Sequence, residues 1–215
     1  LNRFGAGGAG QGSGAYNVPV VLRLRGELNR IALATALHCL QERHETLRTV
    51  FPEIDGEPAQ VVLGPIDAVV PLEESTVTVA DAAEAIHRLT TPGFDLATEV
   101  PLRATLLTVA DVPEEYILVL VVHHIAVDGW SLEPLAADMA TAYRAVLAGI
   151  DPRPDIPPIQ YVDYPLWQQD LLGSEDDPAS PISRQLEYWR HTLAGLPELL
   201  DLPTDRPRPP VPSYR

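Results

Sequence analysis

The stretch that decides the fold covers residues 116–131 and reads Tyr-Ile-Leu-Val-Leu-Val-Val-His-His-Ile-Ala-Val-Asp-Gly-Trp-Ser. Its first seven residues are apolar almost throughout, which predicts a strand that is covered on both faces. His123 and His124 therefore stand where a central strand leaves the core. Ser131 then opens a helix that we expect to reach about Ala148 and to stop at Gly149.

Strands and helices alternate on both sides of this stretch. Residues 102–109 form a second β-favouring run, and a turn with Pro113 separates the two, so we expect a hairpin. Apolar residues at helical spacing predict helices over 28–47, with Asn29 as N-cap, and over 79–89, with Asp81 near the start. Further segments are expected as strands at 18–25, 59–63 and 68–72, a proline-rich extended connector at 152–158, a short aromatic segment at 161–167 and a helix at about 182–193. The pattern predicts an α+β fold in which a mixed or antiparallel sheet is flanked by helices.

Composition excludes several classes of function. The 215 residues include 30 Asp and Glu against 15 Lys and Arg, a formal net charge of -15. Such a charge repels a phosphate backbone, so no nucleic acid is expected as a partner. The longest apolar run is too short to span a bilayer, so no membrane association is expected. The single cysteine, Cys39, lies in an apolar helical run, which indicates a small buried thiol and fits a reducing cytoplasm.

The glycine-rich start, residues 5–10, formally matches the glycine fingerprint of dinucleotide sites. That fingerprint needs a strand before it and a helix after it, so that backbone N–H groups point at a pyrophosphate. Only four residues precede Gly5, and a predicted strand follows. We interpret the segment as a mobile loop and expect no directly bound cofactor.

The histidine pair is the candidate for chemistry, whereas four other histidines lie in helical segments and are assigned none: His38, His44, His87 and His191. Adjacent side chains on a strand point to opposite faces, so one of the pair faces a cleft and its neighbour packs inside. A histidine that titrates near neutrality, beside a helix N-terminus whose backbone N–H groups can hold an oxyanion, suits acyl transfer.

A metal site and a serine hydrolase site fit the same residues less well. Adjacent strand residues diverge, so His123 and His124 cannot converge on one zinc ion and no metal is expected. A serine hydrolase needs a Gly-x-Ser-x-Gly elbow, which the chain lacks, and Ser131 is expected as a helix N-cap. Asp128 can orient the histidine, or it can be a turn aspartate held by an arginine; the spacing fits both.

With those residues in view, residues 123–129 resemble the His-His-x-x-x-Asp-Gly signature of nonribosomal peptide synthetase condensation domains and related CoA-dependent acyltransferases. Residues 43–51, Arg-His-Glu-Thr-Leu-Arg-Thr-Val-Phe, resemble the second motif of that family, and residues 161–168, Tyr-Val-Asp-Tyr-Pro-Leu-Trp-Gln, resemble its fourth. Further likeness at 94–96, 101–103 and 202–209 extends the resemblance over nearly the whole chain.

The resemblance implies a chloramphenicol-acetyltransferase-like fold of two lobes. Residues 1–200 would form the N-terminal lobe, and residues 201–215 a proline-rich crossover toward a C-terminal lobe that these residues do not contain. Because a tunnel between two lobes cannot be built from one, we expect this half-domain fragment to have little or no activity by itself.

The resemblance also assigns roles to single residues. His124 would be the active-site histidine, His123 its inward-facing companion, and Asp128 a structural aspartate. Arg43 would be the salt-bridge partner of Asp128, with Arg48 as the alternative partner. The continuation Asp128-Gly129-Trp130-Ser131 follows the condensing pattern, whereas epimerization domains typically continue Asp-Gly-Val-Ser-Trp and heterocyclization domains replace the histidines with aspartates.

The implied reaction is peptide bond formation, as in antibiotic and other secondary-metabolite biosynthesis. The amine of an acceptor aminoacyl thioester attacks a donor thioester carbonyl, and peptidyl carrier proteins deliver both substrates on phosphopantetheine arms. Implied partners are the donor and acceptor carrier proteins, an adjacent adenylation domain and the C-terminal lobe of the same domain, all in the cytoplasm. Two alternatives stay open: a free-standing acyltransferase that uses coenzyme A, and a non-catalytic docking module, which would be expected to lose the histidine found here at 124.

Overall fold

The computed structural model describes residues 14–153, 155–197, 203 and 205–207. It forms two compact units, Leu1–Gln160 and Tyr161–Arg215. The glycine-rich segment at 5–10, which we interpreted as a loop, lies outside the described residues, as does most of the expected crossover at 201–215. The expected boundary at residue 200 also lies outside them and stays a prediction.

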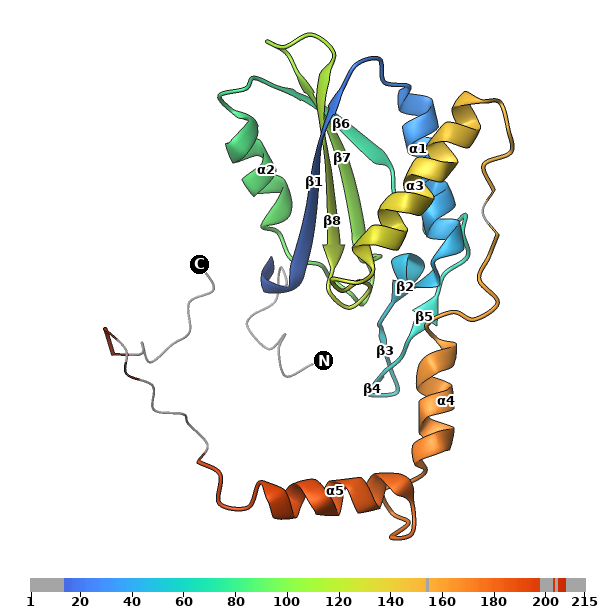
Figure 1. Ribbon diagram of the computed structural model, residues 1–215, viewed down its shortest axis with the longest axis vertical. Helices are drawn as coiled ribbons and strands as arrows, with labels where there is room; N and C mark the ends of the chain where they lie inside the picture. Colours follow the sequence, from blue (N-terminus) through green and yellow to red (C-terminus); the bar gives the residue numbers. More distant parts are fainter. Residues whose placement is uncertain (1–13, 154, 198–202, 204, 208–215) are drawn as a thin grey trace. The chain divides into compact units, whose positions relative to one another are not determined.

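A four-stranded sheet organises the first unit, in the order β1-β8-β7-β6 (Figure 1). The strands are β1 (Asn17–Arg25), β6 (Leu72–Val77), β7 (Leu102–Val109) and β8 (Glu115–His123). β8 pairs antiparallel with both β1 and β7, which confirms the expected hairpin, while β6 and β7 are parallel. A parallel pair needs a crossover connection, and α2 (Ala82–Thr90) lies between β6 and β7 in the chain. The mixed sheet with flanking helices confirms the α+β prediction.

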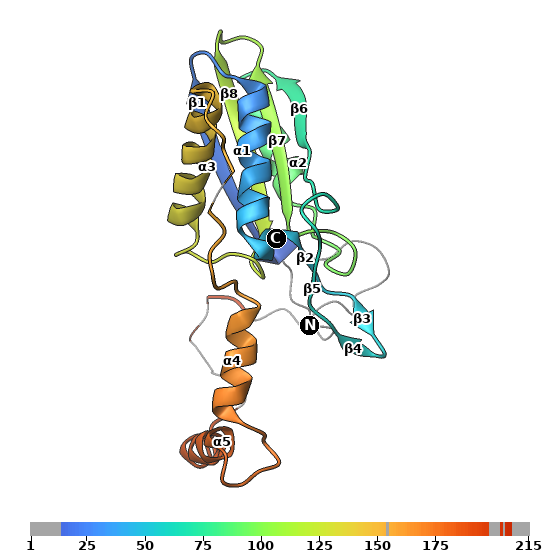
Figure 2. The same cartoon turned by 90° about the vertical axis from the view of Figure 1, so that its right-hand side faces the viewer.

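Both faces of β8 are buried, as the uninterrupted apolar run predicts. Leu118, Leu120 and Val122 belong to the cluster that includes residues of α1 (Arg30–Arg43) and α3 (Leu132–Leu147). Ile117, Val119 and Val121 belong to a second cluster, with Ala82 and Ala85 of α2. α1 and α3 therefore cover one face of the sheet and α2 the other, as Figures 1 and 2 show. The C-terminal end of β8 emerges between these two layers.

The helix boundaries follow local capping chemistry. Asn29 is the N-cap of α1, because its side chain accepts the Ala32 N–H at 2.9 Å. The helix ends at Arg43, earlier than the expected residue 47, and the chain continues as a 3-10 turn at Glu45–Arg48. Gly149, with φ of 67°, follows α3 in the left-handed conformation that favours glycine, as predicted. Cys39 is buried as expected, at 4% exposure, and burial raises the pKa of its thiol.

Small strands fill the connection between α1 and β6. β2 (Thr49–Val50) pairs with β5 (Val61–Val62), and β3 (Glu53–Ile54) pairs with β4 (Glu57–Pro58). The strand expected at 68–72 is wrong, because β6 begins only at Leu72. The backbone at 68–70 is bound by a helix side chain instead: Gln41 Nε2 donates to the Ala68 carbonyl at 2.8 Å, and the Val70 N–H donates to Gln41 Oε1 at 2.9 Å.

The second unit contains two described helices, α4 (Asp163–Leu172) and α5 (Pro181–Thr192). The aromatic segment at 161–167 is mostly helical, and its rings follow one another at centroid distances of 6.2 Å for Tyr161–Tyr164 and 5.7 Å for Tyr164–Trp167. α5 begins after the N-cap Ser180, whose hydroxyl accepts the Ser183 N–H, with a proline in the first turn. Neither helix contains a buried residue. No described helix of the chain is long and apolar enough to cross a membrane.

Candidate active site

The candidate site is the histidine loop, which we define as residues 123–131 between β8 and α3. Backbone hydrogen bonds from two neighbouring segments hold its beginning. The His123 N–H donates to the Pro101 carbonyl at 3.0 Å, and the His124 N–H donates to the Tyr16 carbonyl at 2.8 Å. The loop thus leaves the sheet at a fixed point between the start of β7 and the start of β1.

His123 faces inward and is held as a neutral ring. Its ring lies 5.9 Å from the ring of Tyr16 and 5.9 Å from that of Phe94, which meets it edge-on. The Ile125 N–H donates to Nδ1 at 3.0 Å, so this nitrogen carries no proton. Burial lowers the pKa of His123, and the charge of His124 lowers it further. These contacts suit a packing residue that shapes the turn carrying His124.

His124 is exposed, in contrast to its neighbour. Among residues 14–153, 155–197, 203 and 205–207, no partner forms a hydrogen bond or ion pair with its ring. The structure therefore places His123, the last residue of β8, half-buried and His124, the first residue after it, exposed.

Asp128 and Ser131 form a reciprocal pair at the start of α3. The Ser131 hydroxyl and N–H donate to Asp128 Oδ1 at 2.6 Å and 2.9 Å, and the Asp128 N–H donates to Ser131 Oγ at 3.1 Å. This is the bonding pattern of a capping box, one turn before the helix proper. The hydrogen bonds from Ser131 hold the pKa of Asp128 below its ordinary value. Ser131 precedes the helix as expected, but its hydroxyl binds Asp128 and makes no cap bond to the helix backbone.

The salt bridge expected between Asp128 and an arginine is wrong for both candidates. Arg43 Nε donates to Asp138 Oδ2 at 2.9 Å, and its Nη1 donates to the Asp155 carbonyl. Arg48 binds Glu45 Oε1 at 3.1 Å and the Leu63 carbonyl. Asp128 is exposed and already bonded to Ser131, so no buried charge demands an arginine there.

The remaining motif residues contribute neither close packing nor a buried contact. A Cβ added to Gly129 would meet no atom within 4 Å, and its φ lies outside the left-handed region. Trp130 is 90% exposed. The Ser131 N–H, which lies at the helix start where oxyanion donors were expected, is occupied by Asp128. Within the described part of the chain, no three His, Cys, Asp or Glu side chains come together in a way that could hold a metal ion.

Sequence reasoning missed the residues that surround His123. Asn17 faces His123 across the β1–β8 pair, and its Nδ2 donates to the carbonyls of Thr90 at 2.8 Å and Pro92 at 2.9 Å. Tyr16, next to it, contributes both a ring contact and the carbonyl that binds His124. Nothing in the sequence pairs residues 16 and 17 with 123 until the register of the two strands is known.

Comparison with known proteins shows the family of the chain. The family model of the condensation domain matches residues 8–215, and the chain belongs to this family. A probable non-canonical nonribosomal peptide synthetase, CymA, from Salinispora arenicola is 50% identical over 203 residues, which is 94% of this chain and 2% of that protein. An isonitrile lipopeptide synthase from Mycobacterium tuberculosis is 49% identical over 203 residues, 93% of this chain and 8% of that protein. The chain therefore spans only a small part of these relatives.

Solved structures agree on the fold. The X-domain in its complex with OxyB, from teicoplanin biosynthesis, is 36% identical, with a TM-score of 0.84 over 93% of this chain and 43% of that chain. The epimerization domain of tyrocidine synthetase B is 22% identical, with a TM-score of 0.72 over 89% of this chain and 43% of that one, a likeness of fold alone. The chloramphenicol-acetyltransferase-like fold that the motifs implied is confirmed.

Proposed function

We propose that this chain supplies the histidine-bearing half of a condensation domain that forms an amide between two carrier-bound substrates. The observation that carries the proposal is the placement of His124: its ring is exposed and without a described partner at the end of a central strand, while His123 beneath it is packed and neutral. Family membership over residues 8–215 supports the reaction class.

The proposed step is an acyl transfer. The acceptor amine attacks the donor thioester carbonyl, a C–N bond forms, the C–S bond breaks, and the thiol of the donor phosphopantetheine arm leaves. One proton moves from the amine nitrogen to the departing sulfur. His124 accepts or steers that proton, because an imidazole can act as a general base or acid and this ring is exposed, with no described hydrogen-bond partner. His123 and the Asp128–Ser131 pair act by fixing the loop.

The same reasoning assigns the partners. The donor and acceptor are delivered on phosphopantetheine arms of peptidyl carrier proteins, with an adenylation domain nearby and a C-terminal lobe that completes the cleft. No directly bound metal or redox cofactor takes part in this proposal. The 215 residues alone are expected to show little or no activity.

The test is condensation by the intact protein, with donor and acceptor loaded on carrier proteins and the product measured by mass spectrometry. We expect His124→Ala to reduce the rate at least about a hundredfold, the size of a lost acid–base group. His87→Ala is the matched control, because His87 is exposed on α2 and outside the loop. An undiminished rate in a folded His124→Ala protein would contradict the proposal.

One observation favours a second candidate, a docking module. The X-domain that is 36% identical to this chain was solved as a complex with OxyB. If this chain serves to bind a protein partner, His124→Ala leaves product formation unchanged in the whole assembly. A CoA-dependent acyltransferase, the third possibility, would give the same product from a CoA-linked donor as from a carrier-linked one.

A further inference from the structure

The end of α1 binds the connector that follows α3, residues 149–160. We define the α1 corner as Arg43, His44 and Glu45. Gln160 Nε2 donates to the Arg43 carbonyl at 3.0 Å, and the Glu45 N–H donates to Gln160 Oε1 at 3.2 Å. One side-chain amide thus satisfies a carbonyl at the helix end and a backbone N–H just beyond it. Gln160 is also the last residue of the first unit.

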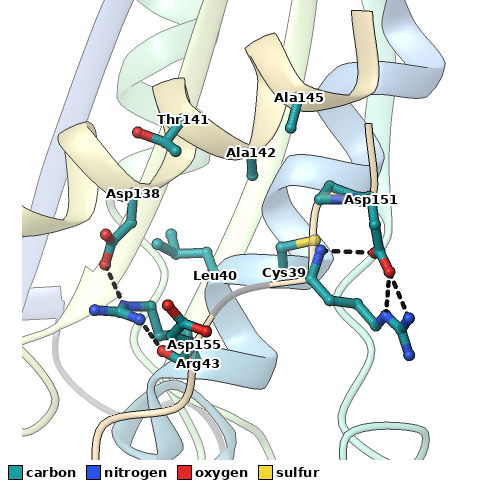
Figure 3. A pocket seen from close by; sticks show the side chains of 11 residues that line it. Cys39, Leu40, Arg43, Asp138, Thr141, Ala142, Ala145, Asp151 and Asp155 are labelled. Carbon is teal, nitrogen blue, oxygen red and sulfur yellow. Dashed lines mark hydrogen bonds and ion pairs between the residues drawn. The ribbon is translucent and has the colours of Figure 1, made fainter. Parts of the chain in front are cut away.

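Arg43 reaches the connector at a second point. Its guanidinium donates to Asp138 on α3 and to the Asp155 carbonyl, and Figure 3 shows it between these two groups. His44 Nε2 lies 2.7 Å from the same Asp138 oxygen. Asp138 therefore fixes the side chains of Arg43 and His44, and the corner in turn binds the connector at residues 155 and 160.

Apolar burial contributes little to holding the connector. Three isoleucines in it are largely exposed: Ile150 at 64%, Ile156 at 57% and Ile159 at 72%. Its middle borders a cavity of about 310 Å³, which is lined by residues of α1 and α3 and by the connector residues Asp151, Pro152, Arg153 and Asp155 (Figure 3). The ion pair of Arg153 with Asp151 stays within the connector itself. Beyond Ile150, whose N–H donates to the Ala145 carbonyl of α3 at 2.9 Å, the polar contacts from the α1 corner are the main attachment among the described residues.

Two glutamine side chains join α1 to other segments, Gln41 from within the helix and Gln160 from the connector, and they differ in burial. Gln41 binds the loop at 68–70 in the same two-way manner, but it is only 1% exposed. Gln160 is half-buried, so water can compete for its hydrogen bonds. Pro152, Pro157 and Pro158 stiffen the connector, because each fixes its own φ. Two attachment points on a stiff segment are enough to fix its course.

We propose that the α1 corner is a releasable anchor for the connector, with Arg43 and Gln160 as its positioning residues. While Gln160 is bound, the end of the connector is held against the end of α1; when it is released, Arg43 still binds the Asp155 carbonyl, and residues 156–160 are free to move away from α1. The proposal goes beyond the proposed function, because it assigns a role to residues outside the histidine loop.

The test is hydrogen exchange by mass spectrometry on the full-length protein, read on peptides that cover residues 149–164. Gln160→Ala removes both bridge bonds and is expected to speed exchange there about tenfold. Gln160→Glu keeps the acceptor for Glu45 but loses the donor to Arg43, so a smaller increase is expected. Arg153→Ala is the matched control, because it breaks an ion pair confined to the connector.

Three outcomes would contradict the proposal that the α1 corner anchors the connector. One is exchange in Gln160→Ala within twofold of the wild type at these peptides. Another is an equal increase in Arg153→Ala. The third is faster exchange that extends to β8, since that would show general loosening of the first unit. An increase confined to residues 149–164 and graded across the two Gln160 variants would support it.

Discussion

The histidine loop and the α1 corner both carry a histidine and a charged side chain, yet their polar groups are satisfied in opposite ways. Asp128 in the loop bonds to Ser131, three residues away. Arg43 in the corner bonds to Asp138, 95 residues away, and the corner backbone bonds to Gln160, more than 110 residues away. Asp128 of the loop is thus bound by a neighbour in sequence, whereas Arg43 of the corner is bound by residues that only the tertiary structure brings close.

Exposure explains the difference. Asp128 is exposed, so water and one neighbouring serine are enough for its charge. The side chains of Arg43 and Asp138 are only 27% and 28% exposed. Removing one of them would leave the other charge partly buried without its partner, which is unfavourable. A substitution that removes one of these charged side chains is therefore expected to destabilise the α1 corner more than the histidine loop.

The largest effect on stability is expected from Asp138→Ala, which removes the acceptor shared by Arg43 and His44. We expect a loss of about 1–3 kcal/mol, because two half-buried donors lose a charged acceptor. The measurement is thermal or denaturant unfolding of the intact domain. Glu84→Ala is the control, since its ion pair with Arg88 is exposed and should change stability by less than about 0.5 kcal/mol. If Asp138→Ala and Glu84→Ala lowered the free energy of unfolding equally, the ion pair of the α1 corner would be no more important for stability than an exposed surface pair.

A smaller effect is expected from pH, through His123. Its pKa is lowered in the folded protein, so below the ordinary value of 6.5 the unfolded chain binds a proton that the folded chain resists. Stability is therefore full above that pH and falls as the pH is lowered through it, until the folded form is protonated as well. His123→Asn keeps an acceptor for the Ile125 N–H but does not titrate. The free energy of unfolding of this variant should lack the pH-dependent contribution of His123. A pH profile identical to that of the wild type would contradict the prediction.

The smallest effect is expected from a double-mutant cycle between Asp128 and Arg43. The two residues bind different partners, so their effects on the free energy of unfolding should add, with no coupling above the error of the measurement. The pair Arg43 and Asp138 serves as the positive control in the same cycle. Coupling between Asp128 and Arg43 as strong as that between Arg43 and Asp138 would contradict this prediction and support the ion pair that the family resemblance implied.

Local sequence signals predicted the elements of the fold well. The apolar run before His123 marked a strand buried on both faces, and Asn29 marked the start of α1, because each signal depends on nearest neighbours. The strand expected at 68–72 failed for the opposite reason. Its backbone groups are taken by Gln41, a residue in a distant helix, and no local pattern records that competition.

The sequence by itself determined the histidine pair, its position at the end of a central strand, and the family to which the chain belongs. Strand alternation also indicated that one histidine packs inside. Only the tertiary structure decided that Tyr16 and Phe94 enclose His123, that Asp128 binds Ser131, and that Arg43 binds Asp138 and the connector. The physical reason is that a charged side chain binds the partner that its burial and neighbours allow, and both are properties of the folded chain.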